Sequence, residues 1–440
     1  MKHTSSAPSS APSSAPVFAH LPPLCPQQRI ERPLTVSEYY HAAIGRHPRS
    51  HVASHDVVFV LEGSGEPDPQ HWQQAIAQAA AANPGACLRL SGKRQHARWY
   101  SDAPAPALRV IENCPWDVRG NEGSEALFAQ PLSLEEGRSA EVILVRGMPK
   151  THRAHHTHPA PLTKVIFRVS HATMDGVGTL HFMQEVFRAL RGEPLLGSNA
   201  SFTDTDLLRQ APSSEIVIEK NISIARMMGA TQGETRGGYW RRLSLDGPQP
   251  HLLPRLLAIM ASYVRQHGER DKVARIGVPA NLRRQIEGLL TTSNFTGMMY
   301  VDLPPTAPLD IDTIKTHLQE LHDAHADMRY RKVYELMRYL PFAWVDGMLS
   351  INEKNYRNPV LHETAILTLL GSFKKSLFSG GGFAAQTLSC LPQLENVFVS
   401  VCGLQGNYEI IVGMPHVFAS GGRMENLLDF IQSKLRHPVP

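Results

Sequence analysis

Residues 164–178, KVIFRVSHATMDGVG, constrain the fold most, because they join two kinds of secondary structure through one short turn. Val165, Phe167 and Val169 alternate with the residues between them, and this period of two predicts a strand. After Gly178 apolar residues recur at helical spacing, which predicts an amphipathic helix ending near Gly192. The apolar positions of this helix are Leu180, Met183, Val186, Phe187 and Leu190.

The turn between these elements carries His171, Asp175 and Gly176 in the spacing H-x-x-x-D-G. A side chain at a strand end is held more firmly than one in a free loop. Histidine is the residue best suited to take a proton near neutral pH. Asp175 could orient the imidazole, or it could pin the turn to another segment. Glycine permits sharp backbone angles and close approach of a substrate. The spacing alone leaves a catalytic histidine and a hydrogen-bonded structural one both open.

SHATMDGVG, followed by LHFMQEVFRALRG, resembles the active-site segment of the chloramphenicol acetyltransferase-like superfamily. This superfamily includes condensation domains of nonribosomal peptide synthetases, plant acyl-CoA-dependent acyltransferases, and wax-ester and polyketide-associated acyltransferases. Condensation domains often carry a second histidine just before the motif, where this chain has Ser170. The resemblance implies an α/β (α+β) fold with two chloramphenicol acetyltransferase-like lobes. Each lobe would be a mixed sheet with flanking helices, and the two would form a V around a central tunnel.

The resemblance also implies a free-standing, condensation-domain-like acyltransferase of polyketide, nonribosomal peptide or lipid biosynthesis. His171 would be the general base that joins an acyl thioester to a hydroxyl or amine, forming an ester or an amide. The Gly176 amide would stabilise the oxyanion, and Ser170 would contact substrate. We expect no tightly bound cofactor and no metal. The co-substrate would be a phosphopantetheine thioester on coenzyme A or on an acyl or peptidyl carrier protein, and the acceptor a small-molecule alcohol or amine.

The second half resembles the superfamily through VPANLRRQI and NFTGMMYVDLP. On that match Arg283 pairs with Asp175 across the lobes and makes Asp175 a structural residue, while the neighbouring Arg284 stays open as the partner. TLSCLPQLEN contains Ser389 and resembles the segment that crosses between the lobes near the tunnel. Ser389 is therefore a predicted substrate contact. The D-F-G-W-G signature of the plant enzymes is absent, which disfavours that branch.

The length of 440 residues favours two lobes of about 200 residues each. A net charge of +4 is small for this length and gives no reason to expect nucleic acid. No window holds the 18 or more apolar residues of a membrane span. The five cysteines are scattered and lack a C-x-x-C, which favours free thiols in a reducing cytoplasm. We expect a cytoplasmic protein and a monomer.

The chain divides into three predicted parts. Residues 1–16 repeat SSAP, which cannot bury enough apolar surface to order itself, and they lack the apolar core of a secretory signal. Residues 17–200 form the predicted N-terminal lobe with the motif, and residues 201–440 form the C-terminal lobe. Helices and strands alternate in both, which fits two α/β lobes with mixed sheets.

Local signals predict further elements. Asp68 and the following proline have the form of a helix N-cap. Ser37 is the predicted cap of a short helix in PLTVSEYYHAAIG. The second lobe should open with a helix at about 216–229, followed by a strand at 274–284. Residues 311 to about 340 are predicted to be helical.

A loop between the predicted strands 140–147 and 164–170 is rich in histidine. It contains no Cys, Asp or Glu, and the chain lacks H-E-x-x-H, so we interpret it as a polar hairpin loop and not a metal site. Its histidines are His152, His155, His156 and His158. The basic stretches 328–332 and 374–375 could meet an acidic carrier or a coenzyme phosphate, although ordinary surface charge is the more common explanation.

Three rival functions are open. The chain could be a catalytically inactive condensation-like binding module, although its intact H-x-x-x-D-G argues against this. It could be a serine or cysteine hydrolase, but no G-x-S-x-G is present. It could also be an epimerising or cyclising relative. Cyclising relatives usually carry Asp in place of the histidine, so His171 speaks against cyclisation.

Overall fold

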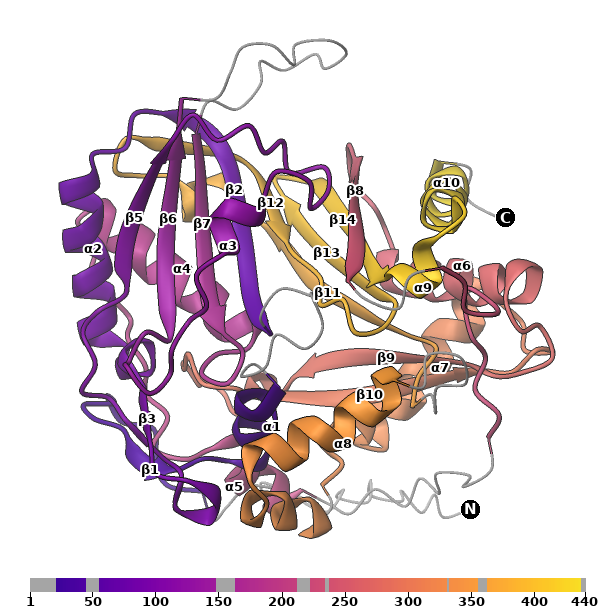
Figure 1. Cartoon of the computed structure of the whole chain (residues 1–440), viewed down its shortest axis with the longest axis horizontal. Coiled ribbons are helices and arrows are strands. Elements are labelled where there is room, and N and C mark those ends of the chain that lie inside the picture. The colour runs from indigo at the N-terminus through magenta and orange to yellow at the C-terminus, as the bar shows by residue number, and fades with distance from the viewer. Residues whose placement is uncertain are drawn as a thin grey trace, which may run out of the picture.

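The computed structural model describes residues 21–44, 55–147, 163–211, 222–233, 237–330, 332–354 and 362–436. The SSAP tract and the four histidines of the 152–158 loop lie outside these residues. Two mixed sheets dominate the described part, one of five strands and one of six. Figure 1 shows the two sheets side by side, each with its own helices. The predicted two-lobe α/β fold is therefore confirmed.

The five-stranded sheet belongs to the first lobe. Its strand order is β12 (Phe383–Cys390), β2 (Asp56–Gly65), β7 (Thr163–Ser170), β6 (Ala140–Arg146) and β5 (Ala107–Glu112). Only the β5–β6 pair is parallel. The helices α2 (Pro69–Ala82) and α4 (Gly176–Leu190) pack on one face (Figure 1). Trp72 and Phe187 meet edge to face there, and the apolar burial of both helices stabilises this lobe.

The six-stranded sheet belongs to the second lobe. Its order is β10 (Thr296–Leu303), β9 (Ala274–Asn281), β11 (Ala365–Phe373), β13 (Phe398–Leu404), β14 (Asn407–Pro415) and β8 (Gly238–Leu245). Apolar side chains of three helices share one core with this sheet, and these helices are α6 (Leu252–His267), α7 (Ile311–Asp323) and α10 (Arg423–Arg436).

A third, small sheet lies beside the first lobe in the order β1 (Glu31–Pro33), β4 (Arg98–Tyr100) and β3 (Arg89–Ser91). The helix α1 (Val36–Ile44) packs against α8 (Phe342–Lys354) near it, with Tyr39 stacked on Phe342 at 4.4 Å between ring centroids. The remaining short helices are η1 (Pro84–Cys87), η2 (Arg94–His96), α3 (Glu125–Phe128), α5 (Asp204–Gln210), η4 (Leu282–Gln285), η5 (Ala326–Met328), η6 (Lys332–Tyr339), η7 (Lys375–Phe378) and α9 (His416–Ala419).

The second half of the chain contributes one strand to the sheet of the first lobe. β12 comes from the second half of the chain but pairs antiparallel with β2 of the first lobe, and the next strand, β13, lies in the second sheet. The segment between them therefore crosses from one lobe to the other. A buried guanidinium reinforces this contact, since Arg242 of β8 binds both Glu62 of β2 and Glu409 of β14. Trp240 and Ile411 of the second sheet also pack with apolar residues of β2 and β7.

Several local predictions can be compared with the structure. Asp68 caps α2 as expected and accepts hydrogen bonds from the Gln70 and His71 amides. The Ser37 prediction is wrong: α1 begins at Val36, two residues earlier than a cap at Ser37 requires, so the capping position falls to Thr35. The Thr35 hydroxyl accepts from the Glu38 amide, and the Glu38 carboxylate accepts from the Thr35 amide, as in a capping box.

Three longer predictions are wrong in part. Residues 222–229, the described part of the helix expected at 216–229, contain no helix. The strand expected at 274–284 ends at Asn281, whose side chain caps the short helix η4. The helix expected at 311–340 ends at Asp323 and is followed by the 3₁₀ segments η5 and η6.

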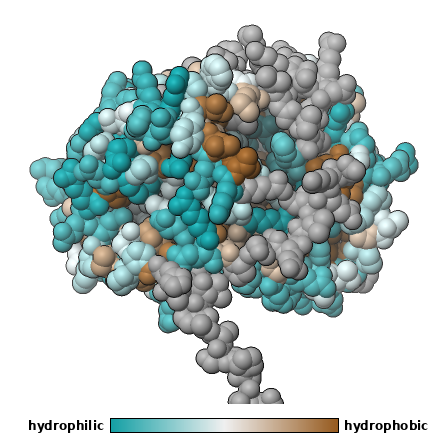
Figure 2. Space-filling model, turned by 90° about the horizontal axis from the view of Figure 1, so that it is seen from below, coloured by the Kyte–Doolittle hydropathy of each residue, from teal (hydrophilic) through white to brown (hydrophobic). Residues whose placement is uncertain are grey.

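Large apolar side chains gather in solvent over η6 and α8. α8 buries Phe342 and Val345 against α1, which leaves its opposite side open. The exposed side chains are Val333, Tyr334, Leu336, Tyr339, Trp344 and Met348. Figure 2 shows the molecule from below, with exposed apolar surface lying among polar residues. Within the part of the chain that the structure describes, no helix is both long and apolar enough to cross a membrane.

Candidate active site

The H-x-x-x-D-G turn lies where β7 passes into α4. β7 ends at Ser170, and α4 begins at Gly176 with Asp175 as its N-cap. The Ser170 carbonyl accepts hydrogen bonds from the amide and the hydroxyl of Thr173, both at 2.9 Å. The Asp175 carboxylate accepts from the Gly178 amide at 2.7 Å. These local bonds fix the direction in which His171 leaves the strand.

Asp175 is pinned by the second lobe. Arg283 donates two hydrogen bonds of 3.0 Å to its carboxylate, which also accepts from the Phe295 amide and the Thr296 hydroxyl. Burial opposes ionisation, but Arg283 and the amide donors outweigh it and lower the pKa of Asp175. The structure thus places Arg283 in the ion pair, whereas Arg284 is exposed.

His171 is partly exposed, and its two ring nitrogens have different surroundings. Nδ1 is buried without a hydrogen-bond partner, as is Oδ1 of the neighbouring Asn294. The amide nitrogen of Asn294 donates to the His171 carbonyl at 2.9 Å. Burial, followed by the charge of His55, lowers the pKa of His171 to about 4. The ring is therefore neutral at neutral pH, and Nε2 is the nitrogen open to a substrate.

Three other side chains complete the cluster around His171. The His41 ring stacks on His171 with 3.9 Å between centroids and 9° between planes. His41 Nδ1 lies 2.8 Å from His55 Nε2, and His55 Nδ1 lies 2.9 Å from Glu395 Oε1. We call Glu395, His55 and His41 the imidazole chain. Sequence reasoning missed all three, because they come from α1, the start of β2 and the crossing segment.

A cavity of about 250 Å³ reaches this cluster between the two lobes. Its lining includes His55, Asp56 and Arg168 from the first lobe, Trp240 from β8, and residues 391–395 of the crossing segment. Glu395 is 34% exposed there. The cavity thus reaches the Glu395–His55 end of the cluster, and His171 is not among the residues that line it.

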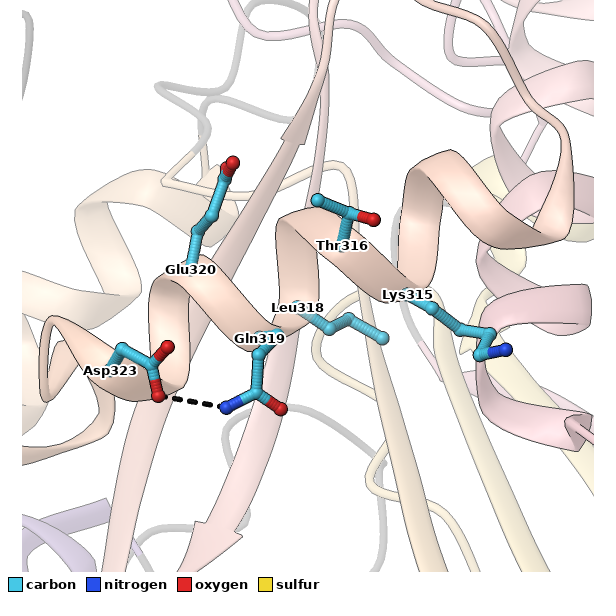
Figure 3. A pocket seen from close by; sticks show the side chains of 6 residues that line it. All are labelled: Lys315, Thr316, Leu318, Gln319, Glu320 and Asp323. Carbon is cyan, nitrogen blue, oxygen red and sulfur yellow. Dashed lines mark hydrogen bonds between the residues drawn. The ribbon is translucent and has the colours of Figure 1, made fainter.

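A larger hollow of about 560 Å³ lies on α7 and is shallow. Figure 3 shows its lining side chains along this one helix, with Gln319 donating to Asp323. None of the residues that line it belongs to the His171 cluster. Size alone therefore does not select the candidate site, which we place at the cluster of imidazoles.

No protein-family model matches the chain, and no curated protein matches it either. Solved structures do match. The starter condensation domain of rhizomide synthetase is 17% identical with a TM-score of 0.59, and the match covers 92% of this chain and 96% of that one. The first condensation domain of the calcium-dependent antibiotic synthetase, bound to a substrate analogue, is 14% identical with a TM-score of 0.64, covering 94% and 98%.

The condensation domain of Monacolin K polyketide synthase is 10% identical with a TM-score of 0.62, covering 94% and 99%. The chain has the condensation-domain fold. The match spans nearly the whole of each structure, so the likeness covers both lobes.

Within this condensation-domain fold the other predicted site residues lie at different distances from His171. Ser170 directly precedes it and is 8% exposed. Gly176 is partly exposed at the start of α4, where the first helical amides have no intrahelical partner. Ser389 faces Val60 on β2, four residues along from Asp56, which faces Ser170. That spacing is about 13 Å, and the Ser389 hydroxyl is buried without a partner.

Three of the five cysteine thiols lie inside the fold. Cys114, Cys390 and Cys402 are buried, and burial raises the pKa of Cys390 to about 12 and that of Cys402 well above its usual value. A thiol with a raised pKa is a poor nucleophile at neutral pH. Among the described residues no group of three His, Cys, Asp or Glu side chains is arranged to hold a metal ion.

Gly178 permits the close contact between the lobes. A Cβ atom there would lie 2.1 Å from the Thr292 carbonyl oxygen, which is backbone and cannot move aside cheaply. We expect Gly178→Ala to destabilise the fold by about 1–3 kcal/mol, as overpacking does. Denaturant unfolding would measure this. Gly347→Ala on α8 is the control, because a Cβ there meets nothing within 4 Å; an equal loss in both variants would contradict the explanation.

Proposed function

We propose that the chain is an acyltransferase that joins an acyl thioester to a hydroxyl or amine, with His171 as the general base. One observation carries this proposal. His171 is a partly exposed, neutral imidazole at the seam of two lobes, on a turn that Arg283 locks from the opposite lobe. Such a base is held in position and is unprotonated when an acceptor arrives.

The reaction requires one proton to move twice. His171 Nε2 would take the proton from the acceptor as its oxygen or nitrogen attacks the thioester carbonyl. The same nitrogen would return that proton to the departing thiolate, so no net proton is consumed. Acid–base catalysis of this kind typically contributes about 10²–10⁴ in rate. The Gly176 amide, at the positive end of α4, is the proposed donor to the oxyanion.

General chemistry and the structural relatives support a proposal for the donor class. One structure of the rhizomide synthetase starter condensation domain contains C8-CoA and Leu-SNAC, both of which are thioesters. We propose that a phosphopantetheine thioester, on a carrier protein or on coenzyme A, is also the donor here. Natural-product assembly is the proposed setting, and Ser170 and Ser389 remain predicted substrate contacts.

The test is to incubate the protein with acyl-loaded carrier proteins or acyl-CoAs and a panel of alcohols and amines. Intact-mass analysis of the carrier and release of free coenzyme A would be followed in parallel. We expect acyl loss that depends on the acceptor and on His171. Carrier binding without any acyl loss would instead favour the binding module, and acceptor-independent acyl loss would favour a hydrolase.

A thiol reagent should leave transfer intact. The Cys25 side chain is exposed and should be alkylated by iodoacetamide, but its segment binds residues 198–199 and lies outside the His171 cluster. We therefore expect unchanged activity after alkylation, with the modification verified by mass. Loss of activity that Cys25→Ser prevents would contradict the absence of a cysteine role.

A further inference from the structure

Three imidazoles and one carboxylate lie together in the active site, although the motif supplies only one of them. His41 stacks on His171, His55 binds His41, and Glu395 binds His55. Resting on the proposed function, we propose that the imidazole chain is a positioning device for His171. It holds one positive charge on His55, fixes the proton of His41 on Nε2, and so keeps His171 in its neutral, basic form.

The hydrogen-bond partners fix the positions of the protons. A carboxylate only accepts, so His55 must donate through Nδ1 to Glu395. If His55 is cationic, Nε2 also carries a proton and donates it to His41 Nδ1. His41 is then the tautomer with its proton on Nε2. Its ring is partly exposed, so this N–H is a second hydrogen-bond donor in the active site beside the base.

The surrounding charges favour the cation on His55 over the other two rings. Burial opposes a charge on His55, but Glu395 and then Asp56 outweigh it and raise its pKa. Burial, His171 and His55 together hold the pKa of His41 well below its usual value. The two directions, together with the contact between His55 and the Glu395 carboxylate, favour a single cation placed on His55.

The other charged groups facing the cluster are already paired. Asp175 binds Arg283 beneath the turn, and Asp56 binds Arg168 at the edge of β2. Burial and nearby carboxylates raise the pKa of the Tyr40 hydroxyl, so Tyr40 is neutral. The centroid of the His55 ring lies 5.5 Å from that of His171, so a positive charge on His55 acts on the base at short range. Removing the Glu395 carboxylate should therefore change the electrostatic potential at the His171 ring, because it changes the protonation of His55.

Stacking explains why this cluster is not a metal site. The His41 and His171 planes are 9° from parallel, so their nitrogen lone pairs lie in two parallel planes and do not converge on one point. Parallel rings instead allow one imidazole to fix the orientation of the other. His41 is thus a positioning residue for His171, and Glu395 acts on His171 through His55 and His41.

Nitrogen NMR of the isotope-labelled imidazoles of the full chain, without substrate, tests the charge assignment. Single variants of His41, His55 and His171 would assign the signals. We expect His55 to be cationic at neutral pH, with His41 protonated only on Nε2. Glu395→Gln keeps an acceptor oxygen but removes the charge, and should leave His55 neutral. A neutral His55 in the unmodified protein would overturn the proposal, whether or not acyl transfer is observed.

The pH profile of kcat/KM tests the effect on the base. The acid limb of the unmodified enzyme should lie near the pKa of His171, about 4. With Glu395→Gln the limb should move upward on the order of one pH unit, because His171 loses a cationic neighbour. Glu395→Asp should restore the original limb in part. Glu136→Gln, in an exposed pair with Arg138, is the matched control and should leave the limb in place.

The two experiments separate this inference from the proposed function. A cationic His55 in a protein that transfers no acyl group would leave the imidazole chain supported and the acyltransferase proposal rejected. Active enzyme whose acid limb is unchanged by Glu395→Gln would reject the imidazole chain and leave the acyltransferase proposal standing.

Discussion

Replacing His171 with alanine should leave a folded protein whose acyl transfer is about 10²–10⁴-fold slower. The loss falls on kcat/KM, because the acceptor no longer meets a base when it attacks. Folding should survive, since the ring is partly exposed and makes no hydrogen bond through Nδ1. The turn itself is held by Asp175 and by the backbone bonds of Ser170.

The measurement is initial-rate transfer from a loaded carrier or acyl-CoA, with circular dichroism and thermal unfolding as folding checks. His71→Ala is the matched control, because His71 lies exposed on α2 outside the His171 cluster. Full activity in a well-folded His171→Ala protein would remove the base assignment. An unfolded variant would be replaced by His171→Gln, which keeps more of the stacking surface for His41.

The sequence predicted the strand, turn and helix around His171 because their signals are local. Alternation over residues 164–170 and helical spacing after Gly178 depend only on neighbours in the chain. The Asp68 cap was predicted for the same reason. The Ser37 error is also local: two hydroxyl residues lie two positions apart, and tertiary packing of α1 selected Thr35.

Long-range pairing could not be predicted from periodicity. The sequence did not identify β11 as a strand, although it lies between β9 and β13 in the second sheet. β12 joins the first sheet by pairing with β2, which lies more than 300 residues away in the chain. A resemblance supplied the crossing segment and Arg283, and the residues themselves gave no signal for either.

The imidazole chain shows the same limit at the active site. His41 and His55 are 14 positions apart, and His55 and Glu395 are 340 positions apart. No spacing rule joins such residues. Glu395 lies in TLSCLPQLEN, the crossing segment that resembles the superfamily, but the resemblance implies a role only for Ser389 in this segment. Glu395 comes close to His55 because β12, which precedes it, pairs with β2, which follows His55.

Replacing Asp175 with alanine should destabilise the protein by about 3–5 kcal/mol, the usual result of removing one partner of a buried ion pair. Arg283 would remain 7% exposed and without its carboxylate, and the Phe295 amide and Thr296 hydroxyl would each lose an acceptor. Denaturant unfolding would measure the change. Glu136→Ala breaks an exposed pair with Arg138 and should cost no more than about 1 kcal/mol.

The pH dependence of unfolding separates the charge of Asp175 from its shape. Its pKa is lowered in the folded protein from an ordinary value of 3.8, so the unfolded chain takes up the proton first as pH falls. Its stabilising contribution is therefore complete above that value and is lost as pH falls below it toward the folded pKa. Asp175→Asn removes the titration, so its unfolding free energy should decline less steeply below pH 3.8 than that of the unmodified protein. If both proteins showed the same pH dependence of unfolding in acid, the charge of Asp175 would contribute nothing to stability. The contact between the lobes would then have to be stabilised by packing at Gly178 and Phe295.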